Sequence, residues 1–125
     1  MEHVLVDTSV WINFLRNGDK VLEDILNNGL LYCHPYIIGE LACGHLSNRQ
    51  EILSLLHELP SATVVEHDEV LHFIDWHKLM GRGLGYIDIH LLASAMLTGV
   101  KLWTLDKNLI KIAQLFSVHY TRENV

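Results

Sequence analysis

The sequence lacks any apolar run close to the roughly 18 residues that a membrane-spanning helix requires. Its start does not show the charged and then apolar pattern of a secretory signal peptide either. Cysteine is scarce: Cys33 and Cys43 are the two present, with neither the CxxC spacing nor the number that a disulfide framework needs. We therefore expect a cytoplasmic protein with no membrane segment, in which both thiols are buried and reduced.

Positive charge is the next scarcity. Nine Lys and Arg residues stand against fifteen Asp and Glu residues, which gives a formal net charge of −6. A generic nucleic-acid-binding protein is usually basic, so this balance argues against simple electrostatic binding of a polyanion. The basic residues gather in the last part of the chain, from residue 78 onward. Such a bias is weak evidence for a phosphate-binding face, because solvated surfaces often show it too.

What is present indicates a single globular domain over residues 1–125. Half of the residues are hydrophobic and 19% are charged, which excludes a disordered chain. Short apolar runs alternate with amphipathic stretches, and this alternation predicts an α/β fold with a mostly parallel central sheet flanked by helices on both faces. The predicted strands are 4–6, 30–33, 63–65, 100–104 and 118–120. The predicted helices are one after Ser9, 20–28, one opened by Pro35, 49–59, one capped by Asp68, 86–97 and 108–116.

The first strand organises this prediction. Val4, Leu5 and Val6 form a run short enough and β-branched enough to be a strand buried on both faces, as the central strands of parallel sheets are. Thr8 or Ser9 is a suitable cap for the following helix. Asp7 would then lie at the carboxyl edge of the sheet, where ligands bind in open α/β folds. The alternative is that Asp7 is a cap or turn residue without chemistry.

Three further acids occupy related positions. Asp106 follows another short apolar strand, and Glu40 and Asp88 lie in the first turns of helices entered from the sheet. Each has a plain explanation, because acids favour helix amino termini and an Asp after a strand makes a good turn. All four, however, are embedded in otherwise apolar sequence. We expect them to converge at one edge of the sheet.

Converging carboxylates raise one another's pKa unless a cation is present. Mg²⁺ and Mn²⁺ take oxygen ligands and commonly sit on a few carboxylates together with a phosphate. One or two such ions can activate a water and stabilise the leaving oxygen in phosphodiester hydrolysis. Thr8, Ser9 and Thr104 are candidates to orient waters at such a site, although capping is the simpler role for the first two.

At this point the sequence resembles the PIN-domain ribonucleases, and in size the VapC-type toxins of toxin–antitoxin pairs. The resemblance rests on four motifs in the family's order, namely Val-Asp-Thr-Ser (6–9), Glu40 within a helix, Asp-Ile-His-Leu-Leu-Ala-Ser-Ala (88–95) and Leu-Trp-Thr-Leu-Asp (102–106). It implies an Mg²⁺- or Mn²⁺-dependent endoribonuclease whose catalytic, metal-binding acids are Asp7, Glu40, Asp88 and Asp106. It also implies an RNA substrate, homodimers, and inhibition by a cognate antitoxin whose tail enters the active-site groove.

One position departs from the family. Many members carry a further acid two residues after the last Asp, followed by Phe, whereas this chain has Asn108 and Leu109. The departure puts a second metal ion in question. Asn108 remains a supporting candidate that could ligate or donate a hydrogen bond.

Other residue patterns point less clearly to chemistry. No two of the nine histidines are three or four residues apart, so a zinc site on one helix face is not indicated. The glycine-rich loop 81–85 matches neither a Walker A nor a dinucleotide fingerprint. The three tryptophans are expected mainly in the core, although tryptophan can also stack on bases. Arg82 and Lys107 are the basic residues that we expect to contact RNA phosphates.

Two alternatives remain open from the sequence. One is a PIN-like module that binds a partner without cutting RNA. The presence of all four acids argues against this alternative. The other is a phospho-receiver or aspartyl-phosphate domain, which also places an Asp after a central strand. The adjacent acidic pair that such a domain would carry is missing, since Ser9 stands where a second Asp would be expected.

Overall fold

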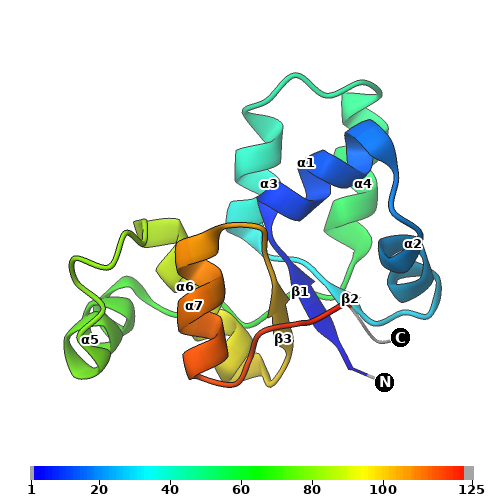
Figure 1. Ribbon diagram of the computed structural model, residues 1–125. Helices are drawn as coiled ribbons and strands as arrows, with labels where there is room; N and C mark the ends of the chain where they lie inside the picture. The colour runs from blue at the N-terminus through cyan, green and yellow to red at the C-terminus, as the bar shows by residue number, and fades with distance from the viewer. Residues whose placement is uncertain (1, 123–125) are drawn as a thin grey trace.

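The computed structural model describes residues 2–122, in which seven helices surround three short strands (Figure 1). The strands are β1 (Val4–Val6), β2 (Leu31–Tyr32) and β3 (Lys101–Trp103). The helices are α1 (Thr8–Asn17), α2 (Lys20–Asn27), α3 (Pro35–Ala42), α4 (Arg49–Glu58), α5 (His67–His77), α6 (Tyr86–Thr98) and α7 (Lys107–Leu115). No helix within this described part is long and apolar enough to cross a membrane.

The sheet is parallel, with β1 in the middle of the order β2-β1-β3. Val4 pairs with Leu31 on one side and with Lys101 on the other. All three residues of β1 are fully buried, as the uninterrupted apolar run predicts. Figure 1 shows helices on both sides of this sheet, with α6 and α7 to its left and α1, α2 and α4 to its right. The predicted α/β architecture is therefore confirmed.

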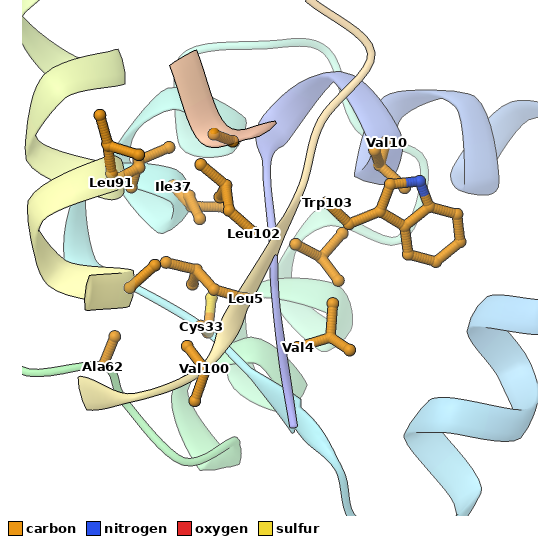
Figure 2. Packing of buried hydrophobic residues seen from close by; sticks show 14 of the residues in the cluster. Val4, Leu5, Val10, Cys33, Ile37, Ala62, Leu91, Val100, Leu102 and Trp103 are labelled. Carbon is orange, nitrogen blue, oxygen red and sulfur yellow. The ribbon is translucent and has the colours of Figure 1, made fainter. Parts of the chain in front are cut away.

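The core lies on both faces of the sheet because neighbouring strand residues point in opposite directions. In β3, Leu102 and Trp103 are 0% and 4% exposed. Figure 2 shows Leu102 beside Ile37 and Leu91 of helices α3 and α6, while Trp103 lies on the side of Val10 in α1. This two-sided packing fixes the sheet between its helices, and so places the carboxyl ends of β1 and β3 next to each other.

Two predicted helix caps are wrong by a few residues. Asp7, and not Thr8 or Ser9, is the N-cap of α1, where its side chain accepts a hydrogen bond from the Thr8 N–H. Glu66, and not Asp68, precedes α5, so that Asp68 lies in the first helical turn. In both cases the helix begins earlier than predicted, because Asp7 and Glu66 already have the extended backbone of an N-cap residue.

The predicted strand 63–65 is wrong. Pairing occurs just before it, as a single bridge between Cys33 and Ser61. The Cys33 N–H donates to the Pro60 carbonyl and the Cys33 carbonyl accepts the Ala62 N–H, at 2.8 Å each. Both backbone groups of Cys33 are therefore paired with residues that precede residue 63. Residues 118–120 do run beside β3, also through a single bridge, between Leu102 and His119.

Burial corrects two further expectations. Cys33 is buried as expected, but Cys43 is exposed at the carboxyl end of α3. Trp11 and Trp103 belong to the core, whereas Trp76 of α5 is 77% exposed. Helical periodicity alone could not separate these cases, because it does not say which side of a helix another element covers.

Candidate active site

Asp7 is the centre of a hydrogen-bond network at the carboxyl edge of the sheet. It follows β1 directly and is only 6% exposed. Its Oδ1 accepts the Thr8 N–H at 2.8 Å, and its Oδ2 accepts the hydroxyls of Ser9 at 2.9 Å and Thr104 at 2.7 Å. Three donors from two separate segments therefore hold this buried carboxylate in one orientation.

Thr104 and Ser9 join the turn after β3 to the turn after β1. The Thr104 hydroxyl donates to Asp7 and accepts the Asp106 N–H at 3.1 Å. The Ser9 hydroxyl in turn accepts the Leu105 N–H at 3.1 Å. Asp106 then caps α7 by accepting the Leu109 N–H at 2.9 Å, and its side chain is exposed at the same edge.

Glu40 reaches this network from the opposite side. It lies in α3, and its Oε1 accepts a hydrogen bond from the Thr8 hydroxyl. Thr8 therefore bonds to Asp7 through its backbone N–H and to Glu40 through its side chain. Glu40 itself is exposed, which leaves this carboxylate open to solvent.

Asp88 completes the group from the first turn of α6. Its Oδ2 accepts the Gly85 N–H at 2.9 Å, which closes the helix amino terminus. Burial raises the pKa of the Asp88 carboxyl above its ordinary value, and the charges of Asp7, Asp106 and Glu40 raise it further, against the lowering effect of the Gly85 hydrogen bond. The other three acids thus lie near enough to Asp88 for their charges to act on its pKa.

A hard divalent cation fits the donor set at this edge. The charged groups are carboxylates, and the repulsion that raises the pKa of Asp88 is what a cation would relieve. Within residues 2–122, no three side chains of His, Cys, Asp or Glu are close enough together to hold a metal ion directly. Mg²⁺ does not require that, since it commonly binds to one or two carboxylates and keeps several waters.

Asn108 points to the glycine-rich loop. Its Nδ2 donates to the Gly83 carbonyl at 3.4 Å. Gly83 has a φ of +76°, and a Cβ added there would lie 2.5 Å from Asn108 Nδ2. The amide therefore links the start of α7 to the loop that leads into α6.

The two basic candidates are exposed. Arg82, within the same loop, donates from Nε to the Lys78 carbonyl at 3.0 Å. Lys107 is the first residue of α7, directly after Asp106. Both are accessible to a ligand at this edge.

Two surface hollows lie near different parts of the fold. The larger, about 550 Å³, is lined by α5 alone and contains none of the four acids. The other, about 350 Å³, runs between α1 and the segment from α3 to α4 and includes Glu40. Its apolar lining comes from Ile12, Leu41 and Ile52 among others. This smaller groove is the one that opens beside the acidic group.

Sequence reasoning missed an aromatic cluster next to the acids. No role was predicted from the sequence for Tyr36, Tyr86 or His90. The rings of Tyr36 and Tyr86 both pack on His90, and both tyrosines are exposed. One signal was available, because Tyr36 lies four residues before Glu40 and so on the same face of α3.

Comparison with known proteins gives a consistent result. The sequence pattern of the PIN domain matches residues 4–115. Ribonuclease VapC32 from two strains of Mycobacterium tuberculosis is 48% identical over 107 residues, which cover 85% of this chain and 86% of the relative. Among solved structures, that of PAE2754 from Pyrobaculum aerophilum superposes with a TM-score of 0.60 at 19% identity, over 88% of this chain and 78% of the other.

Proposed function

This chain belongs to the PIN domain family, and on that basis we propose that it is an endoribonuclease and the toxin of a toxin–antitoxin pair. The observation that carries the proposal is the acidic group at the sheet edge, with Asp7 held by three donors. The 48% identical relatives are named ribonucleases, and their aligned part spans nearly the whole of both chains. The substrate class that follows is RNA.

We further propose that Asp7, Glu40, Asp88 and Asp106 hold a divalent cation, Mg²⁺ or Mn²⁺, one or two of them by direct ligation and the others through the waters of the ion. Ribonucleases of this family are generally metal-dependent. When bound, such an ion lowers the pKa of water and stabilises the charge on the phosphate in phosphodiester hydrolysis.

The chain's own residues supply position and charge. Ser9 and Thr104 keep Asp7 in a fixed rotamer, and Thr8 does the same for Glu40. Arg82 and Lys107 are proposed to contact RNA phosphates from the rim, where they partly offset the acids.

The decisive experiment is cleavage of a 5′-labelled RNA by the purified chain, with Mn²⁺ or Mg²⁺ and with a chelator. We expect Asp7→Asn to reduce cleavage more than about 100-fold, since even the outer partners of metal ligands change activity about 10–100-fold. Asn is also a good N-cap, so the variant should unfold at nearly the wild-type temperature. Asp75→Asn, on exposed α5, is the matched control and should cleave normally.

Wild-type cleavage by Asp7→Asn would overturn the proposed role of Asp7. If no preparation cleaves RNA under any ion, the non-catalytic binding module becomes the better description. In cells, we expect expression of the chain to arrest growth and Asp7→Asn to abolish the arrest.

For the antitoxin we propose the groove between α1 and the α3–α4 segment. Its lining combines apolar side chains with Arg16 and Glu40, so an occupant would cover Glu40, one of the four acids. Ile12 is 38% exposed there. Ile12→Asp should weaken antitoxin binding, measured by calorimetry with the purified partner, while RNA cleavage by the free chain persists.

For the homodimer that the family implies, we propose the exposed side of α5. Trp76 is 77% exposed on this helix, and Leu71 is 46% exposed. Large apolar side chains gathered on one exposed helix are typical of protein interfaces. Light scattering should show a dimer for the wild type and a monomer for Trp76→Glu.

A further inference from the structure

Two exposed tyrosines enclose a buried histidine beside the acidic group. Tyr36, in the first turn of α3, is 37% exposed, and Tyr86, the first residue of α6, is 42% exposed. His90 is 1% exposed. Its ring centroid lies 4.8 Å from that of Tyr36 and 4.6 Å from that of Tyr86, at interplanar angles of 77° and 82°. Each tyrosine therefore packs edge-to-face on the same imidazole.

The tyrosines come from the same helix turns as two of the acids. Tyr36 precedes Glu40 by four residues, so the two side chains are neighbours on one face of α3, about 6 Å apart along its axis. Tyr86 begins the same helix as Asp88 but, two residues before it, lies on another side of α6. It joins Tyr36 through the ring of His90, on which both tyrosines pack. A chain that runs from Glu40 along the same face of α3 would therefore meet these rings.

The rings are also held in place from outside their own helices. The Tyr86 hydroxyl is 2.5 Å from Nδ1 of His67, the first residue of α5. The Tyr36 ring packs on His34 as well, with centroids 5.1 Å apart. Side chains held before binding lose little conformational freedom when a ligand arrives. This arrangement suits a rigid stacking surface.

His90 carries the feature that points to a ligand. Both of its ring nitrogens are buried, and within residues 2–122 neither has a hydrogen-bond partner. Buried polar atoms without partners are rare in folded proteins and often mark a site that a water, an ion or a ligand completes.

We propose that Tyr36, Tyr86 and His90 form a binding subsite for an unpaired RNA base next to the phosphate at the acids. Proteins recognise single-stranded RNA by stacking its splayed bases on aromatic rings. Stacking does not depend on charge, which suits a chain with a net charge of −6. The inference rests on the proposed ribonuclease function. It adds an explanation of how an acidic protein binds its RNA substrate.

The test compares two probes with one backbone, an octamer of adenylate and the same octamer with abasic sites. Binding is measured by fluorescence anisotropy in the Asp7→Asn background, which prevents cleavage. We expect the adenylate octamer to bind about 5- to 100-fold more tightly than the abasic one. Tyr36→Leu combined with Tyr86→Leu should remove this difference.

Matched variants separate stacking from other effects. Tyr36→Phe and Tyr86→Phe keep the ring and should retain the preference for bases. Leu115→Ala removes an exposed apolar side chain at the carboxyl end of α7, to which no role is assigned, and should also retain it. In the cleavage assay, the leucine variants should raise KM more than they lower kcat, with a single-stranded substrate.

Three results would overturn the proposal. The first is equal binding of the two octamers by Asp7→Asn with both tyrosines in place, while the wild type still cleaves RNA; this result removes the subsite and leaves the ribonuclease function standing. The second is an unchanged base preference in the leucine variants. The third is a loss of the dimer in those variants by light scattering, which would assign this face to a second copy of the chain. Failure of all preparations to bind or cut RNA would instead count against the proposed function itself.

Discussion

Asp7 and Asp88 are both aspartates at one sheet edge, yet they differ in their hydrogen-bond donors and in the charges around them. Asp7 receives three hydrogen bonds from Thr8, Ser9 and Thr104. Asp88 receives one, from the Gly85 N–H, and faces three other acids. The negative charge of a carboxylate is destabilised by burial and by like charges nearby, as at Asp88. In the absence of a cation, the charge of Asp88 therefore lowers the stability of the folded protein.

Asp88→Asn should raise the melting temperature of the ion-free protein at pH 7 by a few degrees. Because the pKa of Asp88 lies above its ordinary value of 3.8, the native state binds a proton more tightly than the unfolded state. Stability is therefore lost as the pH rises through the native pKa. The gain should shrink as the pH falls toward 4.

Calorimetry with a chelator measures this effect, and Asp75→Asn serves as the control. Adding Mn²⁺ should stabilise the wild type more than Asp88→Asn, since binding to the native state alone raises stability. Identical melting temperatures for the two proteins at pH 7 would contradict this account of Asp88.

At the scale of elements, three of the four acids lie at the amino termini of helices. Asp7 and Asp106 are the N-caps of α1 and α7, and Asp88 lies in the first turn of α6. The loop before α6 is tied to the start of α7 by the contact between Gly83 and Asn108. The contact joins two of the elements that present acids, so it should control their spacing.

Gly83→Ala should destabilise the protein more than Gly81→Ala does. Both glycines have positive φ, +76° and +73°, which costs about 1–2 kcal/mol for any residue with a Cβ. Only at Gly83 would the new Cβ also lie 2.5 Å from Asn108 Nδ2, whereas at Gly81 it meets nothing within 4 Å. The difference between the two variants isolates the cost of displacing Asn108.

Urea unfolding gives both free energies, and RNA cleavage gives the functional effect. Gly83→Ala should lower cleavage, and Gly81→Ala should leave it near the wild-type rate. Adding Asn108→Ala to Gly83→Ala should recover part of the lost stability by removing the clash. Equal free energies of unfolding for the two single variants would show that the contact between Gly83 and Asn108 does not contribute to stability.

At the scale of the whole molecule, His34 joins the sheet to two helices. It caps α3, where Nδ1 accepts the Tyr36 N–H at 3.0 Å, and its Nε2 lies 3.2 Å from the Ser94 hydroxyl of α6. Since Nδ1 must accept, the proton of the neutral ring is on Nε2. Burial and, to a lesser extent, the nearby His90 together lower the pKa of His34 to about 4. The native fold thus requires this ring to be neutral.

The protein should lose stability as the pH falls from 6.5 toward 4. In that window the unfolded state binds a proton at His34 and the native state does not, which amounts to about 3 kcal/mol at most. His34→Asn keeps a good N-cap residue and should flatten the dependence. Urea unfolding at several pH values measures it, with exposed His45→Asn as the control. A wild-type slope in His34→Asn would assign the dependence to other groups.

The sequence alone was enough to predict the α/β fold and the sheet edge where the acids meet. The apolar run Val4–Val6 allows only a strand covered on both sides, and alternating strands and helices make the sheet parallel. Acids placed after such strands, or at the helix starts beside them, then lie at one edge. These are short-range properties, set by backbone sterics and by the period of burial, so they can be read along the chain.

Only the tertiary structure decided which side chains meet and which stay exposed. Thr104 bonds to Asp7 across 97 residues, because β3 lies beside β1 in a register that no local pattern specifies. Exposure of Tyr36 and Trp76 likewise depends on which helix face another element covers. Such contacts arise from packing between distant segments, whose free energy belongs to pairs of elements rather than to either sequence alone.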